Sequence, residues 1–144
     1  MRRAFTLIEL VVVILILGII AAIVVPRFMA CGVLAKDNRV RQSLSVVRDA
    51  IELFLAANNR LPGADGNEAT FKFDLAPYLR DFPILPVGPA AAQDDSVDMD
   101  NKLSPVKGDN NPTTGWKFYY KTGVLIVNSR EDVASNGSIQ YDDL

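Results

Sequence analysis

The amino-acid sequence predicts an α+β fold, in which a long N-terminal helix packs its C-terminal half on a small antiparallel β-sheet. Three patterns in the 144 residues support this prediction: an unbroken apolar run near the N-terminus, an amphipathic stretch after it, and a hairpin signal near the C-terminus. Charge divides the chain in the same way, because residues 1–60 carry eight basic and four acidic side chains, whereas residues 61–144 carry seven and thirteen. We therefore expect an apolar stem followed by a soluble head.

The apolar run from Phe5 to Val25 is long enough to cross a membrane as a helix. A helix of this length spans about 32 Å, which matches the roughly 30 Å hydrocarbon core of a bilayer. Its β-branched residues disfavour a helix in water, but lipid offers the backbone amides no other partners. Arg2 and Arg3 precede the run and predict a cytoplasmic N-terminus with an exported head. A conventional secretory signal fits less well, because the residues before Ala30 do not suit a cleavage site.

Glu9 is the one acidic residue inside the apolar run. A carboxylate at this depth costs on the order of a few kcal/mol, and such residues usually have a partner and a function. Two interpretations are open from the residues alone. Glu9 either reaches the interfacial water, or it gains a charged partner when the chain is cut just before Phe5.

The first residues also form a recognisable motif. A short basic leader is followed by Ala4, by the unbroken sequence Phe-Thr-Leu-Ile-Glu at residues 5–9, and by the apolar run. This arrangement resembles the class III signal of the type IV pilin and type II secretion pseudopilin superfamily, and it implies a pilin-like fold. The resemblance implies that a membrane prepilin peptidase removes residues 1–4 by cleaving between Ala4 and Phe5, and that Phe5 is then N-methylated. Ala4 departs from the family pattern, which usually has Gly before the cut.

The resemblance also implies roles along residues 5–30, the predicted transmembrane and filament-core helix. In an assembled filament, Glu9 is thought to pair with the N-terminal ammonium of a neighbouring subunit, which relieves the cost of both charges in an apolar core. Thr6 is assigned to filament assembly with it. Gly18 and Pro26 match positions at which the helix of the family is softened. Because Pro26 has no amide hydrogen, a kink or a melted turn is expected there.

The function implied by the resemblance is that of a structural subunit, not an enzyme. Such a subunit waits in the inner membrane and joins a helical filament with copies of itself and with other pilins or pseudopilins. Its further partners are the prepilin peptidase, an assembly ATPase and an assembly platform protein. A type II secretion pseudopilin is favoured, and the alternatives are a major or minor type IV pilin acting in adhesion, motility or DNA uptake. A single-pass membrane protein with a binding head that does not polymerise is an alternative from a different class.

The helix is expected to continue through residues 31–60 as an amphipathic segment and to stop at residues 58–63. Apolar residues at three- and four-residue intervals form one stripe, which predicts a core face against the sheet of the head. The stripe comprises Val40, Leu44, Val47, Ile51, Phe54 and Leu55. Cys31 is the single cysteine, so no disulfide can form within the chain. We expect it to be a small apolar residue on a packed helix face, with intermolecular pairing as the alternative.

The soluble head is predicted to span residues 61–144. Residues 73–82 can form a short helix that Asp74 caps and that has Pro77 in its first turn. The next residues, 83–114, are rich in Pro, Gly, Asp and Asn and are expected to form loops.

A hairpin is predicted from residues 116–120 and 124–127, joined by a turn that contains Gly123. Residues 138–141 are expected to add a third strand. The sequences GWKFYYKTG and VLIVNS resemble a hairpin seen in many pseudopilin heads, and Trp116 is expected to lie in the core.

The candidate metal ligands are Asp94, Asp95, Asp98 and Asp100. Oxygen ligands at short spacing can hold calcium, and some pseudopilin heads carry a calcium site, but a solvated acidic loop is the favoured interpretation and no cofactor is expected. The chain has no histidine, and it contains no nucleophile elbow, phosphate loop or metalloprotease motif. Its basic residues are not interleaved with aromatic ones, so nucleic-acid binding is not expected either.

Overall fold

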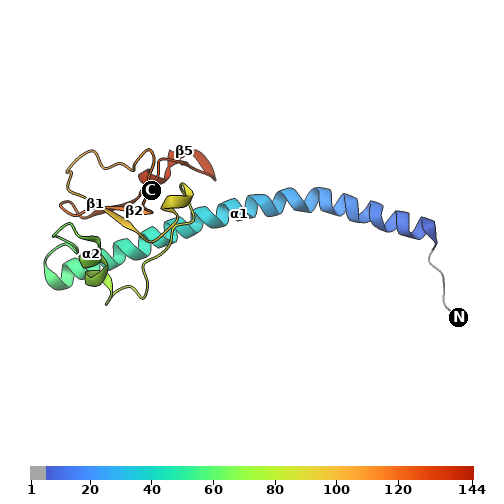
Figure 1. The fold of residues 1–144 in the computed structure, drawn as a ribbon. Coiled ribbons are helices and arrows are strands. Elements are labelled where there is room, and N and C mark those ends of the chain that lie inside the picture. The colour runs from blue at the N-terminus through green and yellow to red at the C-terminus, as the bar shows by residue number, and fades with distance from the viewer. Residues whose placement is uncertain (1–5) are drawn as a thin grey trace. The chain divides into compact units, whose positions relative to one another are not determined.

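The computed structural model describes residues 6–144, apart from the side chains of residues 26, 28–30, 91 and 136. In chain order the elements are α1 (Leu7–Asn58), α2 (Glu68–Leu75), the 3₁₀ helix η1 (Ala90–Ala92), β1 (Val97–Asp100), β2 (Trp116–Tyr119), β3 (Val124–Val127), β4 (Asp132–Val133), β5 (Asn136–Gln140) and the 3₁₀ helix η2 (Tyr141–Asp143). The chain forms two compact units, one ending at Ala35 and the other comprising Lys36–Leu144. The fold class is α+β, as predicted (Figure 1).

Helix α1 contains both the apolar run and the amphipathic stretch. It stays helical at Gly18 and Pro26, so the melted turn that was one of two outcomes expected at Pro26 is not present. The missing amide hydrogen interrupts a single bond of the helical ladder. The helix ends at Asn58, inside the predicted stop, and Asn59 has a φ of 51°. A residue in this left-handed conformation commonly ends a helix.

The amphipathic part of α1 contributes one face to the core of the second unit. Five residues of the predicted stripe are at most 4% exposed: Val40, Leu44, Val47, Ile51 and Phe54. Leu55 is the exception, with 41% of its surface exposed. Successive residues are turned by about 100° around a helix, so Leu55 points away from the face that Phe54 occupies.

The expected packed face at Cys31 is not found among the residues that the structure describes. Cys31 belongs to the first unit, where it is a free and exposed cysteine.

The main sheet is mixed, whereas an antiparallel sheet was predicted. Strands β2 and β3 form the predicted antiparallel hairpin, with Trp116 opposite Val127. The third strand is β1, which pairs with β2 in parallel, so the expectation that residues 83–114 form only loops is wrong. Val97 and Met99 alternate with acidic residues in β1 and give it a strand pattern. That pattern is four residues long and lies in a segment rich in turn-forming residues, which concealed it.

Strand β5 covers most of the predicted third strand, but it has a different partner. It pairs with β4 in a separate two-stranded antiparallel sheet and not with the hairpin. Because residues 134–135 alone separate β4 from β5, a local hairpin brings the two strands together.

The short helix of the head lies earlier than predicted. Helix α2 begins after Asn67, whose side chain accepts a hydrogen bond from the Ala69 amide at 2.8 Å. Asp74, the predicted cap, lies near the end of α2 and is buried. Both residues are good cap types, but Asp74 accepts hydrogen bonds from Arg60, at 2.9 Å to each oxygen, and from the Gly63 amide. The long-range ion pair therefore decides the role of Asp74.

Aromatic side chains fill the core between the strands and the helices of the second unit. Trp116 is fully buried, as predicted, and its indole N–H donates to the Pro83 carbonyl at 2.9 Å. Its ring meets the Phe82 ring edge to face at 5.7 Å, and Phe71 stacks at 4.4 Å on Phe118. Figure 1 shows β1 and β2 beside the C-terminal part of α1, which supplies the facing side of this core.

Candidate functional site

Thr6 and Glu9 build the N-terminal end of α1. The Thr6 Oγ1 atom accepts a hydrogen bond from the Glu9 backbone N–H at 3.3 Å, which satisfies one of the amides left free in the first helical turn. The Thr6 hydroxyl in turn donates to Glu9 Oε2 at 3.5 Å. The Thr-Leu-Ile-Glu spacing is that of a capping box, a local role for this pair that sequence analysis did not assign. Ala4 and Phe5, the predicted cleavage and methylation site, lie outside the described residues.

The Glu9 side chain is exposed at the start of the helix. Its negative charge lies in the first turn, where the helix dipole favours an anion. No ion pair in the described part of the chain includes Glu9. The carboxylate is therefore available to a positive group of another molecule, and its role in assembly stays a prediction.

The segment Leu7–Val25, called the apolar segment below, is long and apolar enough to cross a membrane. It has 19 residues, its mean hydropathy is 3.3, and none of it is buried inside the structure. A helix of this length spans about 28 Å, close to the thickness of the hydrocarbon core. Side chains such as Leu7, 81% exposed, and Ile8, 70% exposed, have no covering partner in the first unit. By length and composition, the segment fits a single-pass membrane anchor.

Gly18 lies in an open part of the apolar segment. A Cβ atom added there would meet no atom within 4 Å. Gly18 borders a shallow hollow that it shares with Val11, Ile14, Leu15, Ile19 and Ala22. Packing against the described residues therefore gives no reason for a glycine at this position, and the softening of the helix at Gly18 and Pro26 stays a prediction.

The four predicted calcium ligands divide into two groups with different partners. Asp94 accepts hydrogen bonds from the Ser96 hydroxyl at 2.6 Å and from the Gly115 amide at 3.0 Å. Asp95 pairs with Lys72 at 3.0 Å. These two carboxylates bind groups of the chain itself and hold the segment that leads into β1.

The other two candidate ligands, Asp98 and Asp100, surround Lys117 in β2. The Lys117 Nζ atom lies 3.1 Å from Asp98, 3.5 Å from Asp100 and 2.8 Å from Asp109. Burial alone would lower the pKa of Lys117, but hydrogen bonds to Asp109 and Asp98 raise it. The Lys117 ammonium group thus occupies the position between these acids at which a metal ion would have to bind. Among the described residues, no group of three or more His, Cys, Asp or Glu side chains is arranged to hold a metal ion.

Asp37 connects α1 to the C-terminal part of the second unit. It is 1% exposed, and its oxygens accept hydrogen bonds from the Ser135 amide, at 2.7 Å, and from the Tyr141 hydroxyl. Burial alone would raise the pKa of Asp37, but the hydrogen bonds from Ser135 and Tyr141 bring it below 3.8. Burial and the bond to Asp37 raise the pKa of Tyr141 to about 12. Sequence analysis missed Asp37, although its position three residues before Val40 continues the buried stripe.

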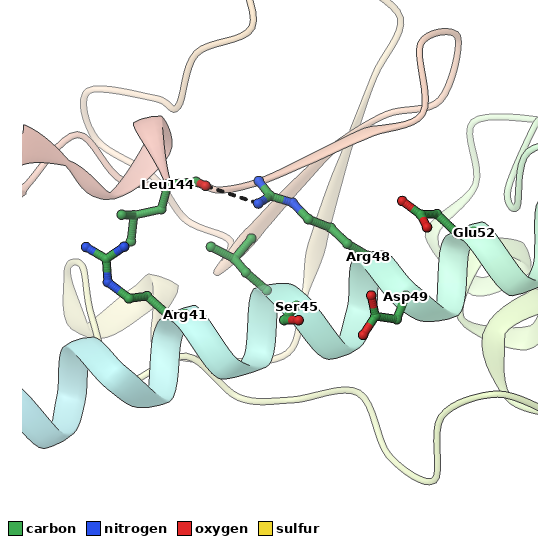
Figure 2. Close-up of a pocket in the computed structure, with 7 residues that line it drawn as sticks. Arg41, Ser45, Arg48, Asp49, Glu52 and Leu144 are labelled. Atoms are coloured by element: carbon green, nitrogen blue, oxygen red, sulfur yellow. Dashed lines mark hydrogen bonds between the residues drawn. The ribbon is translucent and has the colours of Figure 1, made fainter.

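Arg48 connects α1 to β3 and to the last residues of the second unit. Its Nη2 and Nε atoms donate to the Leu125 carbonyl at 2.9 and 3.3 Å, and its Nη1 atom donates to the Leu144 carbonyl at 3.0 Å (Figure 2). Burial lowers the pKa of Arg48. The guanidinium group thus donates its hydrogen bonds to backbone carbonyls. No sequence pattern predicts this role.

These features define a class of protein, namely a small α+β head that follows a single apolar helix segment suited to membrane anchoring. Comparison with known proteins narrows the class. Residues 1–25 match a family model described as the prokaryotic N-terminal methylation motif. No solved structure matches the chain.

Relatives with known names extend the match beyond the motif. Type II secretion system core protein G of Klebsiella pneumoniae is 34% identical over 84 residues, or 57% of this chain and 60% of that protein. The protein of the same name from Pseudomonas aeruginosa is 30% identical over 98 residues, or 60% of this chain and 69% of that protein. The type IV major pilin protein PilA of Myxococcus xanthus is 36% identical over 59 residues, or 41% of this chain and 27% of that protein.

The chain belongs to the type IV pilin and type II secretion pseudopilin superfamily, because it covers more than two thirds of the Pseudomonas protein at 30% identity. This confirms the family predicted from residues 1–30. The chain spans 60% of the length of the Klebsiella protein, which is less than two thirds.

Proposed function

We propose that this chain is a structural subunit of a type IV pilus-like filament, and that it acts as a pseudopilin of a type II secretion system. The observation that carries this proposal is the exposed apolar segment headed by Thr6 and Glu9 within a methylation motif. A chain that leaves so much apolar surface uncovered needs lipid or other subunits around it.

The proposed processing begins in the inner membrane, with the N-terminus in the cytoplasm and the head exported. Prepilin peptidase removes residues 1–4, and the new N-terminus at Phe5 is methylated. The matched motif supports the methylation step, because its description names N-terminal methylation and its residues include Phe5. Removal of residues 1–4 is proposed because methylation of the Phe5 amine requires a free N-terminus there. An Ala at the position before the cut is small enough for the peptidase site.

Glu9 is proposed to direct assembly through charge. Once residues 1–4 are removed, Phe5 carries an ammonium group, and Glu9 of one subunit pairs with that ammonium of a neighbour. Thr6 supports this pairing, because its hydroxyl holds one Glu9 oxygen at the helix start. An unpaired carboxylate in an apolar filament core is costly, so subunits that dock in register are favoured.

The proposed partners are copies of the chain, other pilins or pseudopilins, the prepilin peptidase and the assembly platform protein. No catalytic role or cofactor is proposed. The acids that could have served calcium have partners in the chain, Lys72 for Asp95 and Lys117 for Asp98 and Asp100.

The choice of a secretion pseudopilin over a type IV pilin rests on the relatives and on the hairpin. Several of the matched relatives are named type II secretion system core protein G. The hairpin formed by β2 and β3 is also the one whose sequence resembles pseudopilin heads. The match to PilA favours a type IV pilin as the second candidate.

The first test is the mass of the N-terminal peptide from cells that contain active prepilin peptidase. We expect a peptide that begins at Phe5 and carries one additional methyl group. An intact Met1 in such cells would contradict the proposed processing.

The second test compares Glu9→Ala with the matched control Leu10→Ala, which shortens the next side chain without removing a charge. We expect Glu9→Ala to abolish filaments seen by electron microscopy of sheared cells, while Leu10→Ala retains them. Filaments from Glu9→Ala in the same yield as from Leu10→Ala would contradict the role of Glu9, whereas absence of filaments from the unmodified chain would favour the alternative of a membrane protein that does not polymerise.

A further inference from the structure

Residues 101–115, called the strap below, connect the parallel strands β1 and β2 and lie outside every helix and strand. Among the described residues, no backbone–backbone hydrogen bond includes residues 101–114. A loop of this length without secondary structure of its own is uncommon in a compact domain. Side chains must therefore hold the strap against the rest of the head.

The middle of the strap is held by side chains of the main sheet and of the residue that follows it. The Tyr119 hydroxyl accepts a hydrogen bond from the Lys107 amide at 3.0 Å and donates one to the Lys107 carbonyl at 2.8 Å. The Asn128 side chain accepts a hydrogen bond from the Asp109 amide at 2.8 Å and donates one to the Asp109 carboxylate at 3.0 Å. These contacts place the Asp109 carboxylate beside the sheet.

Lys117 links the strap to β1 through a single positive charge. From β2, its Nζ atom lies 2.8 Å from Asp109 in the strap and 3.1 and 3.5 Å from Asp98 and Asp100 in β1. The Lys117 side chain is 5% exposed, and a buried charge is costly unless it is paired. Here one ammonium group pairs with carboxylates from two segments, so it joins those segments as a bound metal ion would.

The charges around Lys117 show what would take its place. Asp98, Asp100 and Asp109 carry three negative charges, and Lys102, which lies 3.5 Å from Asp100, carries one positive charge. Without Lys117, two negative charges would remain, which equals the charge of one divalent cation. Calcium binds about six to eight oxygen ligands at about 2.3–2.6 Å, and three carboxylates offer six oxygens. The carboxylates would move inward by about 1 Å or less to reach those distances.

We propose that Lys117 is an internal substitute for a divalent metal ion. Its ammonium group links the strap to β1, so the folded head needs no metal there, and a small neutral residue at position 117 opens a calcium site among the same acids. The inference concerns the head alone and does not depend on the filament proposed above. The side chains of Asp98 and Asp109 are 41% and 46% exposed, which leaves both carboxylates room to move toward an ion.

Two substitutions at position 117 separate the charge from the space that the side chain fills. Lys117→Ala removes the ammonium group together with its aliphatic stem and leaves room for an ion. Lys117→Met removes the charge, but its side chain still fills the space beside the acids. The matched control is Lys121→Ala, because Lys121 is an exposed lysine in the turn between β2 and β3 that joins no ion pair in the described part of the chain.

Thermal unfolding of the detergent-solubilised full-length chain, in EDTA and in about 5 mM calcium, is the first measurement. The unmodified chain, Lys117→Met and Lys121→Ala are each expected to unfold at a temperature that calcium does not change. Lys117→Ala is expected to unfold at a lower temperature than the unmodified chain in EDTA. In calcium it is expected to gain about 5 °C or more, because the ion binds only the folded head.

Two results of this measurement would overturn the proposal. An equal gain in the unmodified chain would mean that a metal ion binds although the ammonium group is present. The absence of a gain in Lys117→Ala, including a failure of this variant to fold in calcium, would mean that the acids do not accept a metal ion in place of the ammonium group.

Limited trypsin digestion reports on the strap itself, because Lys102 and Lys107 lie in it. In EDTA, Lys117→Ala is expected to be cleaved after these two residues about tenfold faster than the unmodified chain, because the strap opens more often. Calcium is expected to slow this cleavage again, and mass spectrometry identifies the cut sites. Slow cleavage of Lys117→Ala in EDTA would show that the strap is held without Lys117 and would also overturn the proposal.

Adding Asp109→Asn to Lys117→Ala tests whether the ion binds at these acids. The double variant is expected to lose the calcium gain, because the strap then offers no carboxylate to the ion. An undiminished gain would place the calcium elsewhere on the head and would contradict the proposed site.

Discussion

The apolar segment exposes its apolar side chains, whereas the second unit buries them. Leu7–Val25 is helical with no covering partner, and all of it is exposed. In Lys36–Leu144, the apolar side chains of α1 and the strands are buried together, and buried charges such as Asp37 and Lys117 have hydrogen-bonded partners. The second unit therefore buries its apolar side chains and pairs its buried charges within the chain, whereas the apolar segment needs lipid or other subunits to cover its side chains. Four changes test this contrast, from the largest expected effect to the smallest.

Trp116→Ala is expected to destabilise the second unit most. Removing a fully buried aromatic side chain typically costs about 3–5 kcal/mol, and the change also leaves the Pro83 carbonyl without its indole donor. Thermal unfolding of the detergent-solubilised chain, followed by near-ultraviolet circular dichroism, measures the effect. The matched control is Leu15→Ala in the apolar segment, which is expected to leave this transition unchanged because Leu15 is 63% exposed. Equal shifts from both variants would contradict the contrast.

Lys117→Met is expected to destabilise the head by about 2–3 kcal/mol, because it removes the buried ammonium that pairs with three carboxylates and leaves the nearly buried Asp100 with the exposed Lys102 alone. Asp98 and Asp109 are more exposed than Asp100, which keeps the effect below that of a fully buried pair. Denaturant unfolding at neutral pH measures the change. The control Lys121→Met, in the turn between β2 and β3, is expected to have little effect. A stable Lys117→Met variant would show that the four charges contribute no net stability.

Lowering the pH is expected to reduce the free energy of unfolding of the second unit by less than the Lys117→Met change does. Hydrogen bonds and nearby cations lower the pKa of Asp37, Asp74, Asp100 and Asp109 in the folded chain. A carboxyl whose pKa is lower when folded stabilises the fold above its unfolded pKa, and this contribution is lost as pH falls through the folded pKa. Stability is therefore expected to be constant near neutral pH and to decline below about pH 4.

Unfolding midpoints measured as a function of pH check this expectation. Asp74→Asn is expected to flatten part of the acid decline, because it removes one of the titrating groups. A decline that begins near pH 7 would contradict the assignment to carboxylates.

Phe73→Ser is expected to have the smallest effect. Phe73 lies on α2 with 78% of its surface exposed, so the change in unfolding free energy is expected to stay below about 0.5 kcal/mol. Its neighbour Phe71 is fully buried, and Phe71→Ala serves as the contrasting variant with a large loss. A large loss from Phe73→Ser would mean that this side chain is covered in the folded protein.

Periodic patterns in the sequence predicted the parts of the fold that depend on local order. The stripe at Val40, Leu44 and Val47 identified the core face of α1, and the hairpin of β2 and β3 followed from alternation around a turn. The parallel pairing of β1, the separate sheet of β4 and β5, and the cap at Asn67 were missed. The pairing of β1 with β2 depends on residues that are distant in the sequence, as does the ion pair by which Arg60 takes Asp74 out of a capping role. Local propensity cannot weigh such contacts. The β4–β5 hairpin and the Asn67 cap are local, but their strands and cap form short patterns.

The candidate site was predictable to a similar extent. The motif at residues 1–25 and the apolar segment were evident from composition and order. The bonds of Asp37 and Arg48 were not evident, because they join these residues to Tyr141 and Leu125, which are distant in the sequence.

The bond between Asp37 and Tyr141 has a consequence for the timing of folding. It joins positions that are 104 residues apart, so the second unit cannot close until the chain is present as far as Tyr141. Pairing across so large a separation carries a loop-closure entropy cost that local contacts avoid. A chain that stops before Tyr141 therefore leaves Asp37 with part of its hydrogen-bonding capacity unfilled, and the arrival of the Tyr141 hydroxyl completes the unit.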